Sequence, residues 1–221
     1  MKRLLPLLLA TLVLFAGCGS GDSFNPSPEL LAAAQCLGLS LEDLVDVYVG
    51  VLDLLGSIGG VIPPNMTYNI ATGAYTITLG IGDLAGIVSS PNNLADGLGV
   101  GETATATWEL NGGLAGAPTL TAEGSFTVAR ATATNFTVSG IGGSADGTCE
   151  FDFSSLNFAV NESVSAAPTG TIVFEATTPD GVLDGTMTFT NASPTVTRVV
   201  ATFDGVSYTF FIDLLTFEPI F

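Results

Sequence analysis

The chain has 221 residues, 47% of them hydrophobic and only 11% charged, which suits a single folded domain and excludes global disorder. Its 21 acidic and 4 basic residues give a net charge of −17. A field of that sign repels phosphate backbones and anionic lipid heads, and it excludes nucleic acid as a partner. The chain has no histidine, which removes histidine general bases, histidine-dependent nucleophiles and histidine metal ligands.

The first 17 residues predict a signal peptide. Lys2 and Arg3 are followed by an apolar run over 4–15, and the small residues Ala16 and Gly17 precede Cys18. The apolar run is too short to cross a membrane comfortably. Removal of this leader takes away two of the four cations, so two cations against 21 acids leave a charge of −19.

Residues 14–18, Leu-Phe-Ala-Gly-Cys, resemble the lipobox of bacterial lipoproteins, with Phe15 where the family usually has leucine. The resemblance covers the leader alone. It implies that Cys18 becomes the first residue and carries a diacylglycerol thioether and an acylated amine, with palmitate-type chains as a membrane anchor. Gly19, in place of aspartate, implies sorting to the outer membrane.

Residues 18–28 predict the lipidated cysteine and a flexible tether rich in Gly, Ser and Pro. A helical segment is predicted over 29–58. Ser27 provides an N-cap for a first short helix, Gly38 interrupts it, and Ser40 begins a second helix that ends at Gly56.

From 59 to 221 the apolar residues alternate with Thr and acidic residues, which predicts ten or eleven short antiparallel strands. Asp204 and Gly205 predict a two-residue hairpin turn. Residues 83–101 predict a loop that is long enough to be a lid or cap. The predicted fold is mainly β, an antiparallel meander curled into a barrel or half-barrel, with the N-terminal helical segment packed on its concave apolar face.

Two cysteines remain after Cys18. Cys36 and Cys149 are far apart in the sequence, and an exported compartment permits a disulfide between them. The alternative is two buried free thiols that act as small hydrophobic residues. Neither cysteine has the spacing of a metal or redox motif, and we predict no metal and no cofactor.

Glu150 and Asp152 lie on the same face of a predicted strand, a spacing that suits a calcium site, a carboxylate pair or an ordinary solvent-facing strand. A glycoside hydrolase would need two carboxylates in one cleft about 5 to 10 Å apart. Asp-Gly pairs elsewhere lack the alternate acids of a calcium loop and predict turns.

The sequence predicts a non-enzymatic binding or scaffold module of the cell envelope, held at the outer membrane by its lipid anchor, with an envelope protein as its partner. A first alternative is a carrier of a lipid or acyl chain in the half-barrel. Its ligand-binding residues would be Trp108, Phe151, Phe174 and Phe210. A lesser alternative is a membrane-embedded β-barrel.

Overall fold

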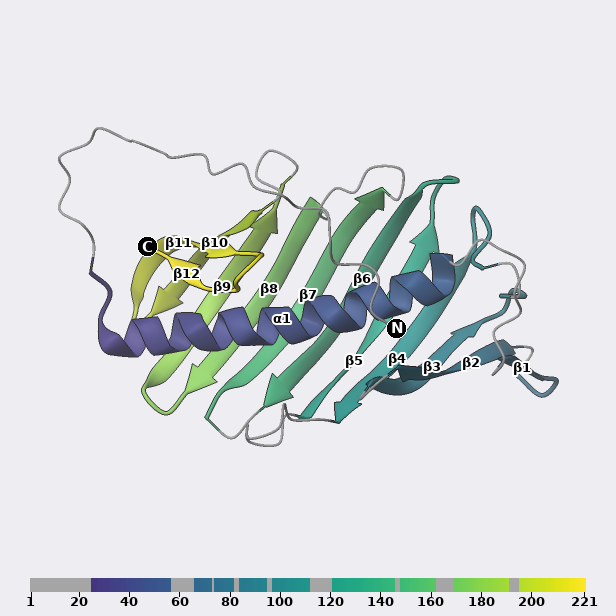
Figure 1. Ribbon diagram of the computed structural model, residues 1–221, viewed down its shortest axis with the longest axis horizontal. Coiled ribbons are helices and arrows are strands. Elements are labelled where there is room, and N and C mark those ends of the chain that lie inside the picture. Colours follow the sequence, from purple (N-terminus) through teal and green to yellow (C-terminus); the bar gives the residue numbers. More distant parts are fainter. Residues whose placement is uncertain are drawn as a thin grey trace.

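The computed structural model describes residues 25–56, 66–72, 74–81, 84–94, 97–111, 121–145, 148–161, 169–190 and 195–221. These residues form one helix and one antiparallel sheet (Figure 1). The predicted signal peptide, Cys18 and most of the tether lie outside the described residues.

The helix is α1 (Pro28–Gly56), and the strands follow it in chain order. They are β1 (Met66–Asn69), β2 (Ala74–Ile81), β3 (Leu84–Ser90), β4 (Thr103–Asn111), β5 (Thr121–Arg130), β6 (Asn135–Ala145), β7 (Glu150–Asn161), β8 (Thr169–Thr178), β9 (Gly181–Phe189), β10 (Val196–Phe203), β11 (Val206–Asp213) and β12 (Pro219–Ile220). Each strand pairs with the next, so β1 and β12 are the two edges of the described sheet, which is not closed. The predicted mainly β, antiparallel architecture is confirmed.

The helical segment is one continuous helix, so the predicted interruption at Gly38 between two helices was wrong. Ser27 caps the helix as predicted, since its hydroxyl accepts a hydrogen bond from the N–H of Leu30 at 3.2 Å. Gly38 does not break the helix. A Cβ at this position would collide with the carbonyl oxygen of Phe217, so the glycine permits close approach of the C-terminal segment. Ser40 lies buried within the helix and does not cap one.

The predicted loop over 83–101 was wrong over 84–90. Its first part is β3, which pairs with both β2 and β4. The connection that follows buries Leu94 and Leu98 in the core. Arg130 holds this connection, because its Nη1 donates to the carbonyl of Leu98 at 2.7 Å. The described part of this segment therefore contributes to both the sheet and the core.

The predicted hairpin turn at Asp204 and Gly205 is confirmed. Phe203 and Val206 pair across it, and the two turn residues have φ angles of 51° and 76°. Positive φ at both central positions is the requirement of the two-residue turns that match strand twist.

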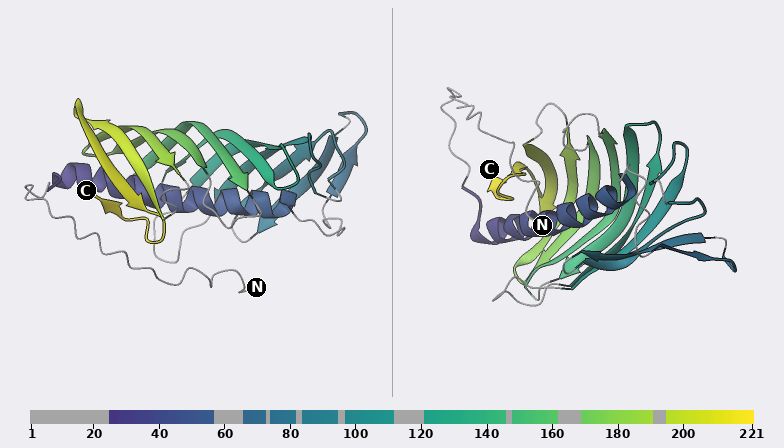
Figure 2. Two further views of the ribbon diagram at one scale, coloured as in Figure 1. Left: turned by 90° about the horizontal axis from the view of Figure 1, so that it is seen from above. Right: turned by 45° about the vertical axis from the view of Figure 1, so that its right-hand side comes forward.

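α1 lies across one face of the sheet, here named the inner face (Figure 2). It contacts β4, β7, β8, β9 and β12. Leu37, Leu41 and Leu44 of the helix share one hydrophobic cluster with the inner-face side chains. A central row of that cluster runs from β3 to β11 through Val88, Ala106, Phe126, Leu156, Ile172, Met187, Val199 and Phe210. Strand alternation places Thr and acidic residues on the opposite, outer face.

Glycines in the sheet make room for the largest inner-face rings. Gly124 and Gly142 are register neighbours between Trp108 and Phe153. A Cβ on Gly124 would lie 2.6 Å from Cζ2 of Trp108, and one on Gly142 would lie 2.8 Å from Cζ of Phe153. The rings of Trp108 and Phe153 therefore cover glycine backbone, which lets aromatic side chains pack closely on the inner face.

Candidate functional site

The helix and the sheet are joined covalently. Cys36 of α1 and Cys149, which directly precedes β7, form a disulfide with their Cα atoms 5.6 Å apart. The sequence left open whether these cysteines form a disulfide or stay as free thiols, and the structure has the disulfide. It closes a sequence separation of 113 residues and fixes α1 against the inner face.

A short hydrogen-bonded chain accompanies the bridge. The hydroxyl of Ser144 on β6 donates to the hydroxyl of Ser40 at 3.1 Å. Ser40 lies 3.7 Å from the Sγ of Cys149, and it is the donor in that contact because a bridged sulfur carries no proton. Both serines are buried, so the chain satisfies polar groups where α1 crosses the sheet.

We expect Ser144→Ala to lower the free energy of unfolding by about 1 kcal/mol, because the buried Ser40 hydroxyl loses its donor. Urea unfolding followed by Trp108 fluorescence measures this change. Ser139→Ala is the matched control, since Ser139 lies on the same strand but is exposed. Equal destabilisation by both substitutions would contradict the assigned role of Ser144.

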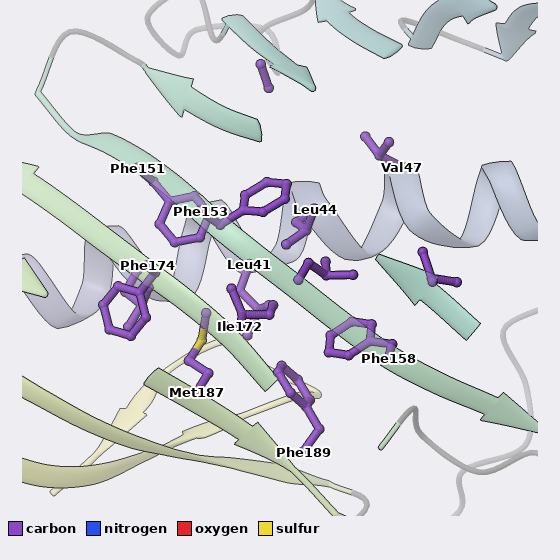
Figure 3. Packing of buried hydrophobic residues seen from close by; sticks show 14 of the residues in the cluster. Leu41, Leu44, Val47, Phe151, Phe153, Phe158, Ile172, Phe174, Met187 and Phe189 are labelled. Atoms are coloured by element: carbon purple, nitrogen blue, oxygen red, sulfur yellow. The ribbon is translucent and has the colours of Figure 1, made fainter. Parts of the chain in front are cut away.

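The four residues predicted to line a hydrophobic ligand site, Trp108, Phe151, Phe174 and Phe210, are all buried in the core. Their rings pack against neighbouring aromatic rings. Ring centroids are 5.5 Å apart for Trp108 and Phe126, 6.3 Å for Phe151 and Phe174, and 4.9 Å for Phe210 and Phe221. Leu41, Leu44 and Val47 of α1 lie over the same aromatic strands (Figure 3). All four side chains therefore contact other residues of the protein core.

A small hollow of about 10 Å³ lies between α1 and the sheet, bordered by Ser40, Val47, Trp108 and Ser144. This volume holds about one water molecule, whereas small-molecule pockets measure about 300 Å³ or more. The Nε1 of Trp108 is buried and has no hydrogen-bond partner among the described residues. At about 10 Å³ the hollow has no room for an acyl chain.

The outer face carries a row of carboxylates that the sequence analysis did not find. Exposed acidic residues occupy one register line across β4, β5, β7, β8 and β9, with Gly143 of β6 in the line between them. They are Glu109, Glu123, Asp152, Glu175 and Asp184. Neighbouring strands lie about 4.8 Å apart, so the row concentrates negative charge on this face. Within the described part of the chain, no group of three acidic or cysteine residues is placed to hold a metal ion.

A groove of about 1240 Å³, open to solvent, runs over β3 to β7 beside this row. Its border includes Glu123, Asp152 and Glu150, and it also includes the exposed Ile87 and Ile141. A register shift between Gly140 and Gly142 leaves Ile141 out of the β6–β7 pairing. The predicted pair Glu150 and Asp152 thus lies at an open groove and not in an enclosed cleft of the glycoside hydrolase kind.

Comparison with protein families, with curated proteins and with solved structures finds no match to this chain. No helix within the described ranges has the length and apolar character needed to cross a membrane.

Proposed function

We propose that this protein is a lipid-anchored, non-enzymatic binding or scaffold module of the bacterial cell envelope. The predicted signal peptide and the lipobox-like residues before Cys18 support export and anchoring, and Gly19 supports the outer membrane as the destination. The disulfide between Cys36 and Cys149 is consistent with an oxidising compartment.

The observation that carries the binding or scaffold assignment is the filled interior. We interpret the twisted sheet as a half-barrel whose concave apolar side is occupied by α1, since helix and inner face share one core. A hydrophobic carrier needs an empty cavity on that side, and the 10 Å³ hollow does not offer one. Partners therefore meet the outside of the sheet, where carboxylates and two isoleucines border the open groove. This chemistry favours a cationic, partly apolar segment of an envelope protein over any anionic polymer.

Lipidation is tested by metabolic labelling with a palmitate analogue in a bacterial host. We expect the wild-type chain to be labelled and Cys18→Ser to lose both the label and the membrane fraction. Phe15→Leu, which restores the residue usual in the lipobox, serves as the control and should keep the label. An unlabelled wild-type protein, or a mature form that still begins at Met1, would reject the anchor.

Carriage of a hydrophobic ligand is tested by native mass spectrometry of residues 19–221. We expect the mass of the polypeptide alone, reduced by two protons for the bridge between Cys36 and Cys149. A lipid that co-purifies at a defined stoichiometry would contradict the filled interior and favour the carrier alternative.

A further inference from the structure

The end of the sheet formed by β10 to β12 exposes large apolar side chains. Phe211 on β11 and Ile220 on β12 are register partners on the outer face, and they are 40% and 45% exposed. Leu215, in the turn between these strands, is 61% exposed. Exposed apolar residues gathered in one place on a soluble domain mark an interaction surface more often than scattered ones do.

A cation lies within the same surface. Arg198 on β10 is the register partner of Phe211, is exposed, and makes no ion pair within the described part of the chain. Arg130, the other cation outside the predicted leader, already has partners within the domain. It donates to the carbonyls of Leu98 and Ala133 and lies over the ring of Phe136. We name Arg198, Phe211, Leu215 and Ile220 the C-terminal apolar patch.

This patch lies at the end of the domain where α1 begins. α1 contacts β12, and Gly38 is held against the carbonyl of Phe217. The C-terminal end of the chain lies beside the first half of the helix (Figures 1 and 2). From Cys18 to Asn25 the chain can span at most about 24 Å at ~3.4 Å per residue. An anchor at Cys18 therefore holds this end of the domain near the lipid surface.

The acidic residues are arranged consistently with such a contact. The carboxylate row lies on β4 to β9, outside the C-terminal apolar patch. Asp213, at the border of the patch, accepts hydrogen bonds from the backbone N–H groups of Leu215 and Thr216 at 2.7 and 3.3 Å. Glu218 remains exposed in the same turn. We therefore expect a zwitterionic surface to be preferred to an anionic one.

We propose that the C-terminal apolar patch rests on the lipid surface to which Cys18 is anchored, with Arg198 against a lipid phosphate. Phe and Leu side chains enter the boundary between headgroups and acyl chains, and an arginine beside them can bury its stem while its charged head stays among the headgroups. The patch is too small to hold the domain on a membrane alone, but the anchor makes its contact intramolecular and raises its effective concentration. This inference rests on the proposed anchoring and adds a fixed orientation of the domain.

The test replaces the lipid with an artificial anchor. The complete chain from residue 19, with a polyhistidine tag in place of Cys18, is bound to phosphatidylcholine vesicles that contain a nickel-chelating lipid. An environment-sensitive dye is attached through Leu215→Cys in one sample and through Thr127→Cys in the control. Thr127 is exposed on the outer face of β5, away from the C-terminal apolar patch.

We expect dye emission at position 215 to shift to shorter wavelength on the vesicles and to become shielded from iodide, with no change at position 127. The shift should be lost when Phe211→Ser and Ile220→Ser are combined, and reduced by Arg198→Glu alone. Unchanged Trp108 emission verifies that these variants remain folded. Identical behaviour at 215 and 127 would overturn the inference and leave the patch to a protein partner. Because the tag supplies the anchor, this result does not depend on lipidation of Cys18, which palmitate labelling tests separately.

Discussion

Replacing both bridge cysteines, in Cys36→Ala/Cys149→Ala, should lower the free energy of unfolding by about 4 to 5 kcal/mol in the chain-entropy model. The size of the effect follows from the sequence separation of 113 residues, because a long closed loop strongly restricts the unfolded chain. A loss of this size is a large part of the ~5 to 15 kcal/mol that stabilises a typical domain. If the double variant does not fold at all, the stability lost with the bridge exceeds the total stability of the domain.

The measurement is urea unfolding of residues 19–221, followed by Trp108 fluorescence, with and without a reducing agent. Reductant should destabilise the wild-type chain by a similar amount and leave the double variant unchanged. Ser139→Ala, exposed and distant from the bridge, should unfold like wild type. A reduced wild-type chain within about 0.5 kcal/mol of the oxidised one would show that the bridge contributes nothing to stability.

Phe126→Ala is expected to cost about 3 to 5 kcal/mol, because it removes a fully buried ring from the centre of the inner face. The Phe126 ring lies between those of Trp108 and Phe153, with centroid distances of 5.5 and 6.4 Å. Both neighbours pack over glycine backbone, and β-strands cannot move to close the space without losing their register. A cavity should therefore remain.

Two measurements check this expectation. Thermal or urea unfolding should show the loss for Phe126→Ala and a change within about 0.5 kcal/mol for Thr127→Ala, its exposed neighbour on the outer face. A small apolar ligand such as benzene should then bind and stabilise the Phe126→Ala variant alone. Binding of such a ligand to the wild-type chain would contradict the proposal that α1 fills the interior.

One glycine, Gly143, influences both the carboxylate row on the outer face and the shape of the open groove beside it. Gly143 lies in the row between Glu123 and Asp152, and a Cβ at Gly143 would collide with the carboxylate of Asp152. The absent side chain leaves the groove open between two acidic strands. Substitution of Gly143 would therefore alter the position of Asp152 together with the shape of the groove.

Local patterns in the sequence were sufficient for several features of the fold. The alternation of apolar with Thr and acidic residues predicted an antiparallel, mainly β domain, and its strands alternate in burial as expected. Ser27 before Pro28 predicted the start of the helix, and Asp204 with Gly205 predicted the last hairpin. Each of these features depends on interactions between residues close in sequence, which local chemistry determines.

Other features depended on residues brought together from distant parts of the chain. From the sequence alone Gly38 predicts a helix break, and only the structure shows that the Phe217 backbone lies against it. The sequence of β3 has no clear alternation, so this strand became evident only from its pairing with β2 and β4. The carboxylate row exists only through strand register, since its acids are spread from Glu109 to Asp184. Alternation also left open whether the apolar face encloses a ligand or a helix. The structure adds the contact of α1 with the aromatic strands, which no single segment encodes, because the burial of one apolar surface against another is a property of the whole chain.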